Sequence, residues 1–174
     1  DVIDSPEVTI QKGERVFIKG KSASGKTTLM SLIGGINQPN SGHLTILDEN
    51  IGELNQSRRY QFRADHIGFI FQLFNLIPYL SFIENITLAC QFSSRRKANA
   101  LSKSLTLEEE AMRLLSHLQF GNEGLLNKQV SDLSVGQQQR VAAARALIGS
   151  PELIIADEPT SALDADTRES FLSL

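Results

Sequence analysis

Gly20-Lys21-Ser22-Ala23-Ser24-Gly25-Lys26-Thr27 is the stretch that decides the fold of this chain. It fits the pattern GxxxxGK(S/T), in which glycines let backbone N–H groups close around a phosphate. In that pattern the lysine reaches the terminal phosphates and the hydroxyl ligates Mg²⁺, so we assign these two roles to Lys26 and Thr27. The predicted phosphate-binding residues are Gly20, Lys21, Ser22, Ala23, Ser24, Gly25, Lys26, Thr27 and Thr28.

The surroundings of this loop support the assignment. Val16-Phe17-Ile18 is a short apolar run that predicts a strand, and residues 27–33 show helical apolar spacing that stops at Gly34-Gly35. The expected order is therefore strand, loop, helix. A helix that starts at the loop adds free N–H groups and partial positive charge to a phosphate site.

Carboxylates and an amide follow two further apolar runs. Residues 153–156 predict a buried strand that delivers Asp157 and Glu158, and residues 67–71 predict a second strand that ends at Gln72. Ligands of parallel α/β sheets bind at the edge where the C-terminal ends of the strands lie. Each group alone is usually polar surface, but beside a phosphate loop we assign Asp157 to Mg²⁺, Glu158 to the general base, and Gln72 to Mg²⁺ or the attacking water.

The segment Leu133-Ser134-Val135-Gly136-Gln137-Gln138-Gln139-Arg140 predicts a helix start capped by Ser134. The helix is expected to run to Leu147 and to end at Gly149-Ser150-Pro151. A hydroxyl and free N–H groups at a helix start suit an anion, but an ordinary capped helix explains them equally well. These residues alone leave both interpretations open.

The remaining segments predict secondary structure but no catalytic or binding residues. Residues 43–47 predict a strand, residues 53–65 a polar and partly helical segment, and the basic, serine-rich residues 93–104 a solvated loop. Thr106 and Glu109 form a capping box for a helix. Its predicted apolar face consists of Ala111, Leu114, Leu115 and Leu118.

Composition limits the classes of protein and site. With 174 residues of which 41% are hydrophobic, the chain can fill one core with a small lobe attached. A net charge of -3 shows no basic stripe, which argues against nucleic acid as a partner. The single cysteine, Cys90, fits a reducing compartment. Polar residues interrupt the uncharged segment 67–83, so we do not expect it to cross a bilayer.

Taken together and in this order, five motifs resemble the nucleotide-binding domain of an ABC transporter. They are Walker A (Gly20 to Thr27), Gln72, the signature-like residues 133–140, Walker B (Leu153 to Glu158), and Ser161-Ala162-Leu163-Asp164. The resemblance spans essentially the whole chain. The sequence around the motifs, such as Glu84-Asn85-Ile86, resembles that of the bacterial ABC proteins that serve lipoprotein release, macrolide and glycolipid export, and cell division.

The resemblance implies an α/β fold: a P-loop NTPase core with a RecA-like parallel sheet and flanking helices, a small antiparallel β part and an inserted helical subdomain. It implies one ABC ATPase domain over residues 1–174. The core would comprise residues 1–72 and 141–174, and the helical subdomain residues 73–140. The C-terminal part of the domain is expected to be absent.

The resemblance also implies an ATPase that uses ATP and Mg²⁺ in a head-to-tail dimer, either of this chain or with a related subunit. Residues of one copy (Lys26, Thr27, Gln72, Asp157 and Glu158) would face Ser134, Gly136 and Gln137 of the other. Asp164 would lie at the dimer seam and couple the two sites.

A membrane permease is the implied partner, contacting about Phe74–Phe82 from the cytoplasmic face of the cell membrane. The transported class is expected to be an export substrate or an envelope lipid or lipoprotein. Two alternatives remain: a soluble ABC-type ATPase acting on a non-membrane partner, and a regulatory module without turnover, against which Glu158 argues.

The chain departs from the family pattern at three places. Val135 replaces the first of two adjacent signature glycines, no histidine follows Walker B, and no aromatic residue precedes Phe17. The family places a switch histidine and an adenine-stacking aromatic there. We therefore expect an incomplete domain with weak nucleotide affinity and weak hydrolysis.

Overall fold

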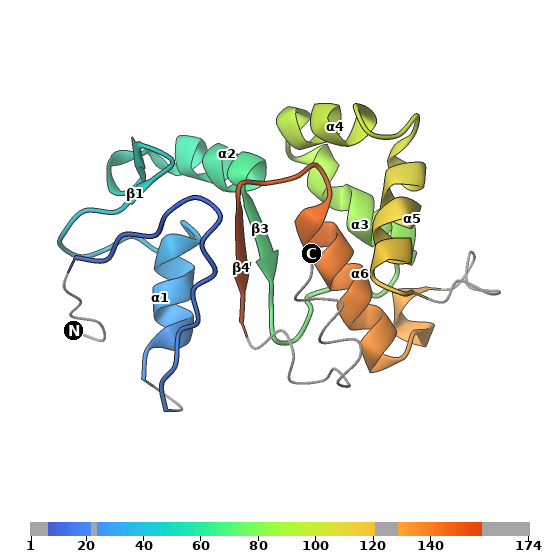
Figure 1. The fold of residues 1–174 in the computed structure, drawn as a ribbon, viewed down its shortest axis with the longest axis horizontal. Coiled ribbons are helices and arrows are strands. Elements are labelled where there is room, and N and C mark those ends of the chain that lie inside the picture. Colours follow the sequence, from blue (N-terminus) through green and yellow to red (C-terminus); the bar gives the residue numbers. More distant parts are fainter. Residues whose placement is uncertain (1–6, 22–23, 121–128, 158–174) are drawn as a thin grey trace. The chain divides into compact units, whose positions relative to one another are not determined.

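The computed structural model describes residues 7–21, 24–120 and 129–157 (Figure 1). The chain divides into two units, residues 1–55 and residues 56–174. The first unit contains the phosphate loop. The second contains Gln72, the signature-like segment and Asp157.

The first unit is built on one helix and a short hairpin. Helix α1 (Lys26–Ile33) ends as predicted, since the Gly34 N–H donates to the Met30 carbonyl and Gly35 adopts a positive φ of 63°. Strands β1 (Thr45–Ile46) and β2 (Glu49–Asn50) pair antiparallel, and the 3₁₀ turn η1 (Ile51–Glu53) follows. The strand expected at residues 43–47 is shorter because the chain turns at Leu47 and Asp48, both left-handed.

The strand expected at Val16–Ile18 is wrong for the structure. These residues form no regular element, and the Phe17 side chain is 83% exposed. A strand needs a neighbour for its backbone N–H and C=O groups. Of the described residues in this unit, only β1 and β2 are paired strands, and each pairs with the other.

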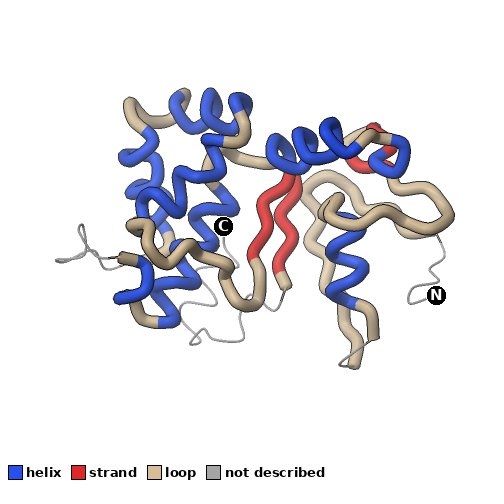
Figure 2. Tube along the Cα trace, turned by 180° about the vertical axis from the view of Figure 1, so that it is seen from behind, coloured by secondary structure: helices blue, strands red, loops and turns tan. Residues whose placement is uncertain are grey.

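The second unit contains a parallel pair of strands and five helices among its described residues. In chain order the elements are α2 (Gln56–His66), β3 (Ile67–Ile70), α3 (Phe82–Gln91), α4 (Ser94–Leu101), α5 (Leu107–His117), η2 (Val130–Asp132), α6 (Val135–Leu147) and β4 (Leu153–Ala156). Strands β3 and β4 lie side by side with Ile67 opposite Leu153 and Ile70 opposite Ala156 (Figure 2). Both strands therefore end at the same edge.

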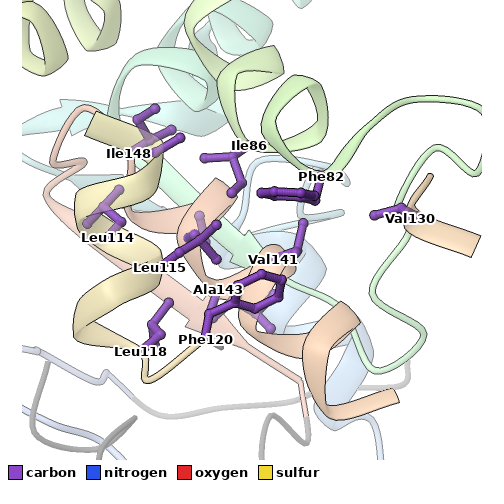
Figure 3. Close-up of a cluster of buried hydrophobic side chains, with 14 of the residues drawn as sticks. Phe82, Ile86, Leu114, Leu115, Leu118, Phe120, Val130, Val141, Ala143 and Ile148 are labelled. Atoms are coloured by element: carbon purple, nitrogen blue, oxygen red, sulfur yellow. The ribbon is translucent and has the colours of Figure 1, made fainter. Parts of the chain in front are cut away.

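The core of the second unit lies between α3, α5 and α6 (Figure 3). The predicted face of α5 is confirmed, because its four apolar residues are all buried, and so is the capping box of Thr106 and Glu109. The fully buried side chains at the centre of this core include Phe82, Ile86, Leu115, Val141 and Ile148. Burying each large apolar side chain contributes roughly 1.5–3 kcal/mol.

The uncharged segment 67–83 does not form one continuous element. It divides into β3, a series of turns and the start of α3. Within the described residues, no helix combines the length and the apolar character that a bilayer crossing requires.

Residues 93–104 are not the solvated loop that the charge pattern predicts, because most of them form α4. The Ser93 hydroxyl accepts from the Arg96 N–H and caps the helix. The Arg96 side chain is buried and donates to the carbonyl oxygens of Arg145, Ala146 and Ile148. Burial lowers its pKa to about 10. The charge pattern predicted a solvated loop because it assumes that water surrounds each arginine. Backbone carbonyls surround Arg96 instead.

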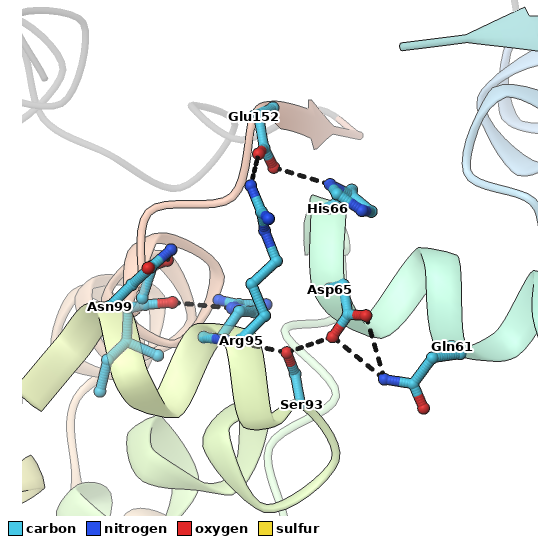
Figure 4. Close-up of polar contacts among 10 residues, drawn as sticks. Gln61, Asp65, His66, Ser93, Arg95, Asn99 and Glu152 are labelled. Atoms are coloured by element: carbon cyan, nitrogen blue, oxygen red, sulfur yellow. Dashed lines mark hydrogen bonds and ion pairs between the residues drawn. The ribbon is translucent and has the colours of Figure 1, made fainter. Parts of the chain in front are cut away.

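Polar contacts also connect α2, α4 and the start of β4 (Figure 4). Glu152 pairs with His66 Nδ1 at 3.0 Å and with Arg95. Burial opposes the charged form of Glu152, but the hydrogen bonds from His66 and Arg95 lower its pKa overall. The Ser93 hydroxyl donates to Asp65 Oδ1 at 2.5 Å. These contacts fix the point where the chain enters β4.

Candidate nucleotide site

The phosphate loop is closed around its lysine. Lys26 Nζ donates to the carbonyl oxygens of Gly20 at 2.8 Å and Lys21 at 2.9 Å. Helix α1 begins at Lys26, and its N-cap, Gly25, has a positive φ of 87° and no side chain to cap the helix. Ser22 and Ala23 lie outside the described residues.

Three features of this loop fit a phosphate group. The Ser24 hydroxyl lies so close to Gly20 that a methyl group there would displace it. The start of α1, without a side-chain cap, directs backbone N–H groups and partial positive charge toward the loop. The Lys26 ammonium, held by two carbonyl oxygens, can exchange these partners for phosphate oxygens. Thr27, with an exposed side chain, follows directly.

The second unit brings Gln72 and Asp157 to one edge of its sheet. The Asp157 N–H donates to the Ile70 carbonyl at 2.9 Å and continues the ladder of β3 and β4 by one bond. Gln72, which is exposed, follows β3 in a turn closed by the Phe74 N–H and the Phe71 carbonyl at 2.9 Å. The predicted strand-end position of both residues is therefore confirmed. Glu158 and residues 161–164 lie outside the described residues.

At the start of α6, Ser134 is the predicted cap. Its hydroxyl accepts from the Gln137 N–H at 3.3 Å, while Gln137 Oε1 accepts from the Ser134 N–H at 2.9 Å. This capping box uses a lone pair of the Ser134 oxygen and leaves its O–H proton able to donate to an anion. A methyl group on Gly136 would meet only Arg140 Nη1, at 3.8 Å. The chain's own packing therefore leaves room at Gly136.

Val135, the departure in the signature-like segment, carries a side chain that is 57% exposed. It is not part of the core of the second unit.

Among the residues that the structure describes, no cluster of three or more His, Cys, Asp or Glu side chains is arranged for a metal ion. The candidate Mg²⁺ ligands, Thr27, Gln72 and Asp157, offer a hydroxyl, an amide and a carboxylate. Magnesium bound with a nucleotide takes few protein ligands of this kind, because phosphates and water complete its octahedron. This donor set suits Mg²⁺ held jointly with phosphates.

The segment predicted to contact a partner, Phe74–Phe82, needs one correction. Phe82 is completely buried in the core, because it begins α3 and packs against Phe120 at a centroid distance of 5.5 Å. Tyr79 is 75% exposed, and Phe74, Leu76, Ile77 and Leu80 are half-buried. Asn75 and Pro78 in the same segment are exposed, so a partner can reach residues 74–80 but not Phe82.

Two polar side chains that sequence reasoning missed, one buried and one half-buried, hold this segment. Asn85 is fully buried; it accepts from the Ile77 N–H at 2.7 Å and donates to the carbonyls of Ile77, Leu80 and Ser81. Arg145 donates to the carbonyls of Phe74 and Asn75. The signal for Asn85 was available, since an asparagine on the apolar face of a helix must find partners when buried.

Comparison with known proteins places these motifs in a family. A family model described as ABC transporter matches residues 3–161. The lipoprotein-releasing system ATP-binding protein LolD of Shewanella denitrificans is 38% identical over 173 residues, which cover 99% of this chain and 70% of that protein. The macrolide export ATP-binding/permease protein MacB of Pasteurella multocida is 39% identical, over 99% of this chain and 25% of that protein.

A solved structure agrees with this similarity in fold. It is the dimeric structure of a post-hydrolysis state of the ATP-binding cassette MJ0796 bound to ADP and Pi. The match has a TM-score of 0.81 and 35% identity, and covers 95% of this chain and 69% of that one. The predicted P-loop NTPase fold is thereby confirmed.

Proposed function

Because the chain belongs to the ABC transporter family of ATP-binding proteins, we propose that it binds and hydrolyses ATP in a head-to-tail dimer that drives a membrane permease. The observation that carries the proposal is the closed phosphate loop, in which two backbone carbonyls hold the Lys26 ammonium at the start of α1. The dimeric arrangement of MJ0796 supports the same assembly here.

The residues divide the work between binding and chemistry. The loop from Gly20 to Thr28 would hold the phosphates, and Thr27, Gln72 and Asp157 would hold Mg²⁺. Bound with ATP, Mg²⁺ neutralises charge on the phosphate oxygens. Glu158 takes the proton of the attacking water. The second copy contributes Ser134, Gly136 and Gln137 at the start of its α6, where the Ser134 O–H can donate to a phosphate.

The transported class and the location belong to the same proposal. The names of the relatives refer to lipoprotein release and macrolide export. We propose export, or the handling of envelope lipids or lipoproteins, by a subunit on the cytoplasmic face of the cell membrane. The permease would contact the exposed part of residues 74–80, where Tyr79 protrudes. A soluble ABC-type ATPase with a non-membrane partner is the alternative.

The test is ATP binding and hydrolysis by the complete ATP-binding protein with three single substitutions. We expect Glu158→Gln to lower kcat by about 100-fold or more while ATP still binds, because only the general base is lost. Lys26→Ala should weaken ATP binding by roughly tenfold or more, because one phosphate contact disappears. Arg95→Ala is the control. It removes a side chain on α4 that pairs with Glu152 at the surface, and it should retain both ATP binding and hydrolysis.

Wild-type turnover in Glu158→Gln would contradict the assigned chemistry. Stimulation of hydrolysis by a membrane permease distinguishes the proposal from the alternative. An ATPase that responds only to a non-membrane partner would favour the soluble class.

A further inference from the structure

The turn that follows Gln72 has an unfavourable backbone. Phe71 and Phe74 close the turn through the Phe74 N–H and the Phe71 carbonyl, so Gln72 occupies one of its two central positions. Phe74 (φ 60°) and Asn75 (φ 49°) then adopt left-handed conformations in succession. Asparagine tolerates this region, but a bulky aromatic residue rarely adopts it, so Phe74 is the unfavourable position. The Asn75 N–H donates locally to the Leu73 carbonyl at 2.6 Å, and contacts from α6 add to this bond.

Arg145, on α6, provides those contacts. Its Nη1 donates to the Asn75 carbonyl at 2.7 Å and its Nη2 to the Phe74 carbonyl at 2.5 Å. The two ends of one planar guanidinium thus hold the two left-handed residues at once, each through a separate nitrogen in a fixed geometry. Burial lowers the pKa of Arg145, but an arginine keeps its charge at neutral pH. Within the described residues, both partners of this cation are backbone carbonyls.

The attachment connects two parts of the proposed ATP site. Helix α6 begins beside Ser134, and Arg145 lies ten residues after Val135 on the same helix. At 1.5 Å per residue, this is about 15 Å of rigid helix. The turn that presents Gln72 is therefore fixed to the helix that presents Ser134.

We infer that Arg145 is a positioning residue for ATP hydrolysis, which fixes the place of Gln72 by holding the carbonyls of Phe74 and Asn75 against α6. The inference rests on the proposed function. Arg145 touches no reacting atom and acts through Gln72. When its hydrogen bonds are lost, the left-handed pair relaxes and the Gln72 amide leaves its position, while the phosphate loop keeps its own contacts.

The experiment measures kcat and KM for ATP in the complete ATP-binding protein assembled with its membrane partner. We expect Arg145→Met to lower kcat about tenfold or more with KM within about threefold, because misplacing a catalytic contact affects the chemical step. Arg145→Lys keeps the charge but places its N–H donors on a single nitrogen at the end of a flexible stem, so its loss should be smaller than that of Arg145→Met. Arg96→Lys is the matched control: Arg96 also donates to backbone carbonyls, but those of Arg145, Ala146 and Ile148, none of which belongs to the turn that carries Gln72. Its kcat should stay within about twofold of wild type.

A double-mutant cycle separates positioning from general stability. In a Gln72→Ala background, Arg145→Met should lower kcat by less than about twofold more, because residues that act through one another are not additive. Additive losses, or a kcat for Arg145→Lys equal to wild type and to Arg96→Lys, would overturn the inference. If Arg145→Met does not fold, Arg145→Lys takes its place in the cycle with Gln72→Ala, and the same two results overturn the inference. Absence of hydrolysis by the wild-type protein would instead overturn the proposed function.

Discussion

At the scale of single residues, Val135 is the departure from the family pattern that the structure explains best. The family has glycine there, but the valine side chain is more than half exposed and is not part of the core. On either side of it, Ser134 caps α6 and Gly136 has open space beside it. The substitution therefore leaves in place the two residues that we propose contact a phosphate.

The prediction for this residue is a small effect. Val135→Gly should change the ATPase rate by less than about threefold, because no phosphate contact is gained, and should destabilise the start of α6 by less than about 1 kcal/mol. Steady-state ATPase assays and urea denaturation of both proteins measure this. A gain in rate of tenfold or more would show that the valine obstructs the site.

At the scale of elements, α4 holds the connection between α6 and β4. The Asn99 amide donates to the Gly149 carbonyl at 3.1 Å, and Lys103 Nζ donates to the Ser150 hydroxyl at 2.6 Å. Gly149 has a φ of 73°, and a methyl group there would come within 2.5 Å of the Cβ atom and carbonyl oxygen of Arg96. The turn between signature helix and Walker B strand thus packs directly on the backbone of α4.

Gly149→Ala should therefore lower the free energy of unfolding by about 3 kcal/mol, since a left-handed alanine costs about 1 kcal/mol and the collision with α4 adds about 2. Gly42→Ala is the control. Gly42 has a φ of 87° but nothing within 4 Å of the added methyl, so only the first cost applies. Chemical denaturation of each variant gives the two values. Equal losses would mean that the packing of Gly149 on α4 contributes nothing.

Local signals predicted the elements that depend on local chemistry. The capping box at Thr106, the helix cap at Ser134, the glycine stop after α1 and the two apolar strands are found where the sequence placed them. The elements that depend on distant partners were missed. Helix α4 needs the α6 carbonyls to bury Arg96, and Phe82 needs Phe120 to become core. Periodicity and charge within one segment carry no information about such partners.

At the scale of the whole molecule, the fold and family are confirmed, and the arrangement of the ATP site stays a prediction. Residues 20–28 belong to the first unit, and Gln72, Ser134 and Asp157 belong to the second. The strand-end and helix-cap positions within the second unit were predictable, because parallel strands end at one edge and serine caps helices. The pairing of a phosphate loop with another copy's Ser134 depends on assembly, and no single segment encodes it.

The most direct test of the composite ATP site is the mass of the complete protein in solution, measured by light scattering on Glu158→Gln with Mg²⁺ and either ATP or ADP. The account predicts a dimer with ATP and a monomer with ADP, because removing the general base traps the ATP-bound assembly. Adding Ser134→Arg should return the ATP-bound protein to a monomer without loss of ATP binding. A Glu158→Gln protein that stays monomeric with ATP bound would contradict the claim that a second copy completes the site.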